Sequence, residues 1–267
     1  MRIDGRKDLN TAGTQYNIYL IGMGAGAGTR QGATLTGLTV VNSRDTGISL
    51  NSAFNNTITG NTVIGNALNG GIRLTGASSN NTITGNTVQG NSYGITVSAS
   101  SSYNTITGNT AQGNTSYGIF ISSSNNTITG NTAQGNVWGI TVNSGSYNTV
   151  SGNTVQGNTT YGIYISSSAA SNTITGNTVH DSGGATANNG IFLDAADSNT
   201  FSDNTITDTS CTTTCHAINI LNSTSDNNYL SGNTFSTTSG TATVNDSGTG
   251  TRYAGQATTQ GGLDLRF

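Results

Sequence analysis

Short runs in which apolar and polar residues alternate recur along almost the whole chain. A block of the form N-T-I-T-G-N-T-V-x-G-N carries two of these runs, with Ile and then Val as their central apolar residues. A third run lies between successive blocks, as from Gly118 to Ile121: a small residue, Ile, any residue and an aliphatic residue. Alternation with a period of two is typical of β-strands that bury one face. Each repeat therefore predicts three short strands.

The repeat has a period of 22 to 25 residues in its regular part, which rises to 29 residues near the end. A unit of this length cannot bury its apolar face alone, so successive copies must stack. We expect an all-β, right-handed, single-stranded parallel β-helix (a β-solenoid) of about nine coils with three short parallel sheets. The repeats occupy residues 34–236, between an N-terminal end segment or first coil at 1–33 and a C-terminal end segment at 237–267.

Stacking of the coils places equivalent residues in columns about 4.8 Å apart. Columns of Ile, Val and Ala are predicted to point inward and form the core. One corner of each coil carries an asparagine, whose amide can both donate and accept hydrogen bonds along the stack. We predict a structural asparagine ladder formed by Asn61, Asn86, Asn109, Asn131, Asn153, Asn177, Asn204 and Asn233.

The N-T-I-T-G-N-T-V blocks resemble the parallel β-helix repeats of the pectin-lyase-like superfamily, and in particular those of NosD-like proteins. The resemblance covers roughly Thr34 to Phe235. It implies the β-helix fold. It does not imply one activity, because this fold hosts lyases, hydrolases, epimerases, adhesins and inert scaffolds.

Charged residues are scarce and unevenly placed. They make up 7% of the chain, all eleven acidic residues are Asp, and no Asp, Glu, Lys, Arg or His lies between Leu74 and Val179. A net charge of −3 without a basic patch argues against nucleic-acid binding. The longest apolar stretch, Ile18 to Met23, is far below the roughly 20 residues of a membrane span. No apolar leader segment is visible after Met1.

Outward positions of the middle coils carry a set of aromatic residues. Four precede the Gly of the third run, and three occupy the outward position of the strand that follows, so they should form one exposed strip. Such a strip can stabilise a corner, pack laterally against another chain, or stack on the apolar faces of sugar rings. The candidate glycan-binding or lateral-contact aromatics are Tyr93, Tyr117, Phe120, Trp138, Tyr161, Tyr164 and Phe192.

The first strand of most coils exposes a Thr on either side of a buried Ile, as at Thr82 and Thr84. This flat Thr-x-Thr face is similar to the ice-binding surface of insect antifreeze solenoids, although Thr is also a common residue of exposed strands. Ice binding is therefore a minor alternative function.

Two pairs of aspartates are predicted to lie one coil apart, Asp181 beside Asp208 and Asp197 beside Asp226. Carboxylates at that spacing could hold Ca²⁺. They could equally be turn residues, a position that Asp favours for local backbone reasons. His180 continues a column of outward Gln residues, and a metal role for it is not expected.

Cys211 and Cys215 lie in the enlarged corner of a late coil. Oxidised, they would close a small loop, and such a disulfide fits an extracellular setting. A metal site would need more ligands than this pair provides.

The middle coils contain no acidic, basic or imidazole group that could act in acid–base catalysis. We therefore expect no catalytic residues, and no cofactor other than a possible Ca²⁺. The main expectation is an extracellular or cell-surface structural solenoid that assembles end to end as a homo-oligomer or homopolymer. The alternative is a surface protein that binds or cleaves an extracellular glycan. An enzyme confined to the late coils would use Asp194, Asp197 and His216.

Overall fold

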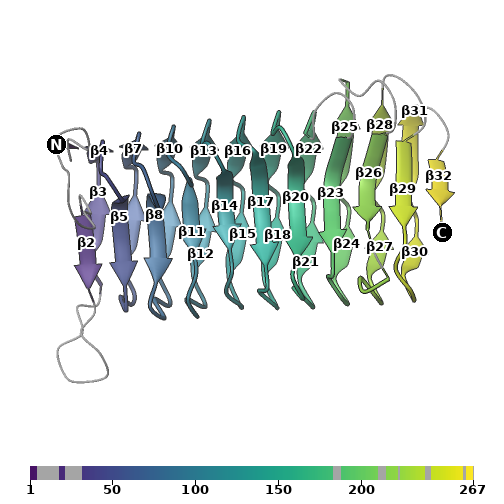
Figure 1. Ribbon diagram of the computed structural model, residues 1–267, viewed down its shortest axis with the longest axis horizontal. Helices are drawn as coiled ribbons and strands as arrows, with labels where there is room; N and C mark the ends of the chain where they lie inside the picture. Colours follow the sequence, from purple (N-terminus) through teal and green to yellow (C-terminus); the bar gives the residue numbers. More distant parts are fainter. Residues whose placement is uncertain are drawn as a thin grey trace.

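The chain forms a rod of stacked parallel strands, shown by a computed structural model (Figure 1). Within the described part of the chain, all regular secondary structure is β-strand, and every pairing between strands is parallel. The described part also holds no helix that is long and apolar enough to cross a membrane. The structure describes residues 1–4, 18–21, 32–182, 188–209, 215–221, 223–237, 242–260 and 263–266.

The strands form three sheets in which each strand pairs with the equivalent strands of the neighbouring coils. Sheet 1 has 11 strands: β1 (Arg2–Asp4), β4 (Thr39–Val41), β7 (Thr62–Ile64), β10 (Thr87–Gln89), β13 (Thr110–Gln112), β16 (Thr132–Gln134), β19 (Thr154–Gln156), β22 (Thr178–His180), β25 (Thr205–Asp208), β28 (Thr234–Thr237) and β31 (Ala257–Gln260). Sheet 2 has 11 strands: β2 (Ile18–Ile21), β5 (Thr46–Asn51), β8 (Gly70–Thr75), β11 (Ile95–Val97), β14 (Tyr117–Ile121), β17 (Trp138–Asn143), β20 (Tyr161–Ser166), β23 (Asn188–Asp194), β26 (Cys215–Ile220), β29 (Ala242–Asp246) and β32 (Leu263–Arg266). Sheet 3 has 10 strands: β3 (Thr34–Thr36), β6 (Thr57–Thr59), β9 (Thr82–Thr84), β12 (Thr105–Thr107), β15 (Thr127–Thr129), β18 (Thr149–Ser151), β21 (Thr173–Thr175), β24 (Thr200–Ser202), β27 (Tyr229–Ser231) and β30 (Arg252–Ala254).

The predicted parallel β-solenoid with three sheets is therefore confirmed. Each of the nine copies of the repeat supplies one strand of sheet 3, from β3 to β27, and β30 adds another after the last copy. Strands also extend into both end segments, with β1 and β2 before the repeats and β29 to β32 after them. Of these end strands, β2 follows a short apolar run that indicates a strand, whereas the others were hard to predict because the residues around them do not follow the repeat.

The core is a set of straight apolar columns along the axis of the rod. Ile83 pairs in register with Ile58, and Ile106 with Ile128, and the side chains of all four are fully buried. In the later coils the same column widens to Phe201, which is also fully buried. Because every inward position faces its own copies, the alternation of the sequence translates directly into a continuous core.

Three asparagine ladders run along the rod, where the sequence predicted one. In the predicted ladder, Oδ1 of Asn109 accepts the backbone N–H of Asn86 at 2.9 Å and its amide Nδ2 at 2.9 Å. The amide of Asn109 in turn donates to the backbone oxygen of Ile83 at 2.8 Å. Each asparagine thus satisfies backbone groups that would otherwise be buried without partners at a corner.

The two further ladders flank the predicted one and make the same contacts. One begins at Asn56 and Asn81, and the other at Asn66 and Asn91. The signal was available, because each N-T-I-T-G-N-T-V-x-G-N block contains three asparagines. The first of these ladders runs to Asn228, whereas the second ends at Ser182, where a serine takes the place of asparagine.

Candidate functional site

The outer face of sheet 2 carries the predicted aromatic strip. The rings of Tyr93 and Tyr117 stack at 5.2 Å with an interplanar angle of 6°, and those of Tyr117 and Trp138 at 4.6 Å and 20°. Phe120 lies tilted against Tyr117 at 4.8 Å. The register of neighbouring coils brings these residues together, because Tyr117 pairs with Trp138 across β14 and β17. Stacking at these distances is attractive and orders the rings.

A second aromatic group lies in the coils that follow. The ring of Tyr161 stacks on that of Phe192 at 4.4 Å and 10°, and lies 5.1 Å from that of Tyr164. Phe192 is only 6% exposed, and the other aromatic residues of the strip are half-buried. The strip is thus less exposed than the alternation pattern indicated, because neighbouring rings cover one another.

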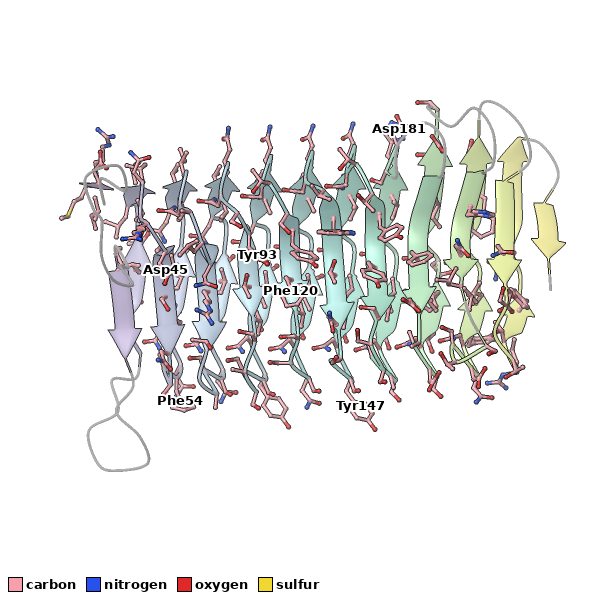
Figure 2. All side chains as sticks on the ribbon, in the orientation of Figure 1. Asp45, Phe54, Tyr93, Phe120, Tyr147 and Asp181 are labelled. Carbon is pink, nitrogen blue, oxygen red and sulfur yellow. The ribbon has the colours of Figure 1, made fainter. Side chains whose placement is uncertain are left out.

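An open cleft of about 250 Å³ lies beside the first aromatic group. It spans residues of the coils that contain β8, β11, β14 and β17. Figure 2 shows two of its aromatic residues, Tyr93 and Phe120, on the face of the rod that points toward the reader. The cleft is lined by Asn69, Arg73, Tyr93, Thr96, Ser98, Tyr117, Phe120 and Asn143. Aromatic walls with a few polar groups are typical of sites for small polar ligands.

Arg73 is the cation of this cleft. It stands in an outward position of β8, next to Thr96 on β11, and is half-buried. The salt bridges of the described residues are those between Arg2 and Asp4 and between His180 and Asp181, so Arg73 takes part in none of them. Its guanidinium is therefore available to an anionic group of a ligand, which it can bind through two parallel hydrogen bonds.

Asn69 is held in place by a buried carboxylate. Its amide Nδ2 donates to Oδ1 of Asp45 at 2.6 Å, and the hydroxyl of Thr46 donates to the same oxygen at 3.1 Å. Asp45 is only 2% exposed. Since Asp45 lies one coil before Asn69, the stacking of the coils orients this polar group at the cleft. Sequence reasoning did not identify Asn69, because it belongs to a loop outside the regular block.

The cleft also contains a hydrogen-bonding group without a partner. The hydroxyl of Thr96 is buried, and it finds no partner among the described residues. The indole N–H of Trp138, whose ring stacks on Tyr117, is likewise buried without a partner among the described residues. An unpaired buried polar group costs about 1–3 kcal/mol. Because its oxygen is buried below the surface, Thr96 does not present this hydroxyl to a ligand in the cleft.

One tyrosine of the cleft, Tyr117, remains neutral near pH 7. Burial raises the pKa of Tyr117 above its usual range, and the nearby Tyr93 and Tyr164 hydroxyls raise it further. Tyr93 and Trp138 cover both faces of the Tyr117 ring. Tyr117 can therefore offer a ring edge and a hydroxyl to a ligand, but it is poorly suited to act as a base.

The acidic residues predicted as pairs make hydrogen bonds within the loops. Asp181, at the upper edge of Figure 2, accepts the backbone N–H of Thr209 at 2.6 Å and its hydroxyl at 2.8 Å. Burial raises the pKa of Asp181, but these hydrogen bonds and the adjacent His180 outweigh it and hold the pKa below its usual value. Asp208, in the position one coil later, is 8% exposed.

The second pair behaves in the same way. Oδ1 of Asp197 accepts the backbone N–H of Asp226 at 2.9 Å. Asp226 in turn accepts the backbone N–H of Thr249 at 2.9 Å and its hydroxyl at 2.5 Å, and these bonds lower its pKa. Asp197 and Asp226 thus have a role as turn residues, and Ca²⁺ binding stays a prediction.

The other predicted sites are only partly brought together. Asp194 ends β23, whereas His216 pairs with Asn189 near the start of that strand. The five residue steps from Asn189 to Asp194 span roughly 16 Å, so Asp194 and His216 do not form one site. Cys211 lies outside the described residues, as does the side chain of Cys215, so their disulfide stays a prediction.

The predicted threonine face exists as a geometric feature. Thr105 and Thr107 of β12 pair in register with Thr127 and Thr129 of β15 on sheet 3. This regularity follows from the repeat itself, and ice binding stays a prediction.

The chain matches one protein family over most of its length. The profile of the family described as periplasmic copper-binding protein (NosD) matches residues 13–177 and 111–262. No curated protein sequence matches the chain significantly.

Several solved structures share the fold at low sequence identity. The A-module of the Azotobacter vinelandii mannuronan C-5 epimerase AlgE6 superposes with a TM-score of 0.74 at 19% identity, covering 97% of this chain and 72% of that one. The AlgE4 A-module from the same organism gives 0.71 at 18%, covering 100% and 72%. Tailspike protein 3 of bacteriophage CBA120 gives 0.62 at 16%, covering 92% of this chain and 50% of that one. At these identities the likeness concerns the fold alone.

The description of the family raises the question of a copper site. Copper in proteins is held mainly by imidazole and sulfur ligands. The described residues contain no group of three or more His, Cys, Asp or Glu side chains placed to hold a metal ion. Both ring nitrogens of His180 are engaged, Nδ1 by Thr207 at 2.6 Å and Nε2 by Asp181 at 3.0 Å. The described residues therefore do not fit a copper centre.

Proposed function

This chain belongs to the NosD family, and on that premise we propose that it is a polysaccharide-binding β-helix that works outside the cytoplasm. The proposed ligand is an acidic polysaccharide held in the cleft over β8, β11, β14 and β17. The observation that carries the proposal is an arginine, in no salt bridge with the described residues, beside stacked aromatic rings in one open cleft.

The aromatic rings supply the surface on which a sugar would lie. The apolar face of a sugar ring packs well on an aromatic ring, and rings held in place by their neighbours lose little entropy when they bind. Tyr93 and Trp138 cover the two faces of the Tyr117 ring and fix it, so a sugar would lie against the outer edge of this stack and against Phe120, which is tilted to it. This position allows a glycan to run along the rod across several coils.

Arg73 supplies selectivity for acidic sugars. A guanidinium forms bidentate hydrogen bonds with a carboxylate, and no described acidic residue forms a salt bridge with it. Asn69 lies in the same cleft, and its amide can bind sugar hydroxyls. The A-modules that share the fold come from enzymes named for mannuronan, a polymer whose sugar units carry carboxylates.

The lining residues favour binding over catalysis. General acid–base chemistry at a sugar needs a group that titrates near the working pH. The described lining of the cleft offers one guanidinium and two tyrosines as its titratable groups, and the pKa of Tyr117 is raised. We therefore propose that the ligand is held without being cleaved or epimerised.

Calorimetric titration with mannuronate hexamers tests this function. We expect binding by the unaltered chain, and a 10- to 100-fold weaker affinity for Arg73→Gln, since hydrogen bonds to charged groups contribute about 1.5–3 kcal/mol. Tyr117→Ala should weaken binding about tenfold, because it removes the central ring of the stack against which the sugar would lie. Gln112→Ala, an exposed residue on sheet 1, serves as the control. An unchanged affinity of Arg73→Gln, or turnover of the hexamer, would contradict the proposal.

End-to-end association is a second candidate function. Within the part of the chain that the structure describes, each terminal strand pairs with one strand of its sheet: β1, β2 and β3 at one end, and β30, β31 and β32 at the other. Open sheet edges are templates for pairing with another chain. Sedimentation of the purified chain over a hundredfold range of concentration tests this candidate, and a constant monomer mass would rule it out.

A further inference from the structure

Two tyrosines project from one corner of the rod, away from the aromatic strip. The side chains of Tyr103 and Tyr147 are 64% and 67% exposed. Tyr103 lies in the connection from β11 to β12, and Tyr147 in the connection from β17 to β18. Figure 2 shows Tyr147 at the lower edge of the rod with its side chain directed outward.

The backbone at both positions would suit another residue better. Tyr103 and Tyr147 each have a φ of 58°, in the left-handed region. Asn tolerates this region, whereas a bulky side chain rarely adopts it. The equivalent residues of the other coils are Asn or Ser with almost the same φ, namely Asn55, Asn80, Asn125, Ser171, Ser198 and Asn227. The fold therefore gives no reason for tyrosine at these two places, and such outliers often mark functional positions.

The two tyrosines lie two coils apart in the same column. The backbone N–H of Tyr103 donates to the oxygen of Asn125 at 2.9 Å, and the N–H of Asn125 donates to the oxygen of Ser146, the residue before Tyr147. Since neighbouring coils are about 4.8 Å apart, the two tyrosines are spaced by roughly 9.6 Å along the rod. This is close to the length of one disaccharide unit in an extended β-1,4-linked glycan, in which every second sugar presents the same face.

We propose that Tyr103 and Tyr147 form a second glycan-binding surface, the tyrosine ridge, which stacks on alternate sugars of an extended, uncharged β-1,4-linked glycan. The stretch between Leu74 and Val179 contains no acidic, basic or imidazole group, so the ridge selects no charge on its ligand. The ridge needs neither Arg73 nor the cleft for its contacts, so this proposal goes beyond the proposed function.

The spacing of the rings provides a sharp test. The double variant Asn125→Tyr with Tyr147→Asn keeps two tyrosines but places them on adjacent coils. The single variant Tyr147→Asn keeps only one and introduces the residue that equivalent coils carry, so both variants should fold. Circular dichroism and thermal unfolding check this before binding is measured.

The probes are cellohexaose and chitohexaose, with maltohexaose as a curved α-linked control, in calorimetric titrations. We expect the unaltered chain to bind at least one β-linked hexamer and not maltohexaose. Tyr147→Asn should bind about fivefold more weakly, and the double variant should be no better than Tyr147→Asn. Failure of both β-linked hexamers to bind, or full affinity in the double variant, would overturn the proposal.

Two further outcomes separate the ridge from other sites and partners. Arg73→Gln should bind the neutral hexamers as the unaltered chain does, even if it loses the acidic ligand. Loss of neutral-hexamer binding in Arg73→Gln with no loss in Tyr147→Asn would assign the binding to the cleft and overturn the ridge. Self-association in sedimentation that Tyr103→Asn abolishes would identify a second copy of the chain as the partner and overturn it as well.

Discussion

The middle coils and the late coils satisfy their corner backbone groups with different chemistry. Between Leu74 and Val179 the acceptors are neutral amides, as where Asn109 accepts the N–H of Asn86. In the late coils two of the ladders continue, but the longer loops add carboxylates, as where Asp226 accepts the N–H of Thr249. The comparison shows that amides suffice where coils repeat evenly. Loops that depart from the repeat recruit aspartate, and this makes them sensitive to pH.

The same contrast is visible in the packing of sheet 2. In the middle coils the residue before the inward Ile is Gly, as at Gly118. A Cβ atom at that position would lie very close to a backbone oxygen of the neighbouring coil. In the late coil that position is Ala217, and the pairing of β26 with β29 changes register between His216 and Ile218. The late coil can therefore accept a methyl group that the middle coils exclude.

The largest effect is expected from breaking an amide ladder in the middle of the rod. Asn109→Ala removes the acceptor of the Asn86 N–H and the donor to the Ile83 oxygen, which leaves both buried groups without partners. At about 1–3 kcal/mol for each such group, the free energy of unfolding should fall by about 3–5 kcal/mol. Urea-induced unfolding followed by circular dichroism measures this. A loss below 1 kcal/mol would mean that water replaces the ladder.

Adding a methyl group at a glycine of a middle coil should lower the free energy of unfolding by less than Asn109→Ala does, but by a clearly measurable amount. A Cβ on Gly118 would lie 2.6 Å from the backbone oxygen of Gly139 and 2.7 Å from Nδ2 of Asn136. Gly118→Ala should lower the free energy of unfolding by about 2–3 kcal/mol through overpacking. The control is Gly113→Ala, where φ is +57° but no atom lies within 4 Å, and where only the left-handed backbone costs about 1 kcal/mol. Equal losses would refute the steric explanation.

Acidification should act on the late coils before the middle ones. The folded pKa values of Asp181 and Asp226 lie below the usual value. Their stabilisation is therefore complete above the unfolded pKa of about 3.9 and is lost as the pH falls through the lower folded values. At about pH 2, pepsin should cut the late loops while the fluorescence of Trp138, in a middle coil, stays unchanged.

The matched variant is Asp181→Asn with Asp226→Asn. It keeps acceptor oxygens at both loops but removes the titrating groups, so the difference in pepsin sensitivity between pH 7 and acid should shrink. A simultaneous change of Trp138 fluorescence and loop cleavage in the unaltered chain would show that the rod responds to acid as one unit.

The smallest effect is expected on the exposed amide column of sheet 1. Gln134 pairs with Gln112 and Gln156 in the neighbouring coils, but its side chain is exposed. Gln134→Ala should change the free energy of unfolding by less than about 0.5 kcal/mol. A loss comparable to that of Asn109→Ala would show that outer amides stabilise the rod as strongly as buried ones.

The repeat made most of the fold predictable. Because the coils stack with little offset, the columns of Ile106 and Ile128, and the ladder through Asn109, follow from the spacing of the blocks alone. The flanking ladders, such as the one through Asn104, could have been predicted by the same reasoning. The end strands β1 and β32 could not, since their pairing depends on residues that the repeat does not define.

The candidate site was predictable only in part. The aromatic column was readable, because Tyr117 and Trp138 occupy equivalent positions. The degree of burial of Phe192 was not, since it depends on how neighbouring rings tilt. The cleft itself combines Arg73 from a strand with Asn69 from an irregular loop, and the contact of Asn69 with Asp45 bridges two coils. No local pattern encodes such a combination.

The most direct test of polysaccharide binding is a crystal structure of the chain soaked with mannuronate hexamer. The proposal predicts a sugar ring against Tyr117 and Phe120, with a carboxylate within hydrogen-bonding distance of the Arg73 guanidinium. Sugar density on another face of the rod, or a bound sugar whose carboxylates point away from Arg73, would contradict it.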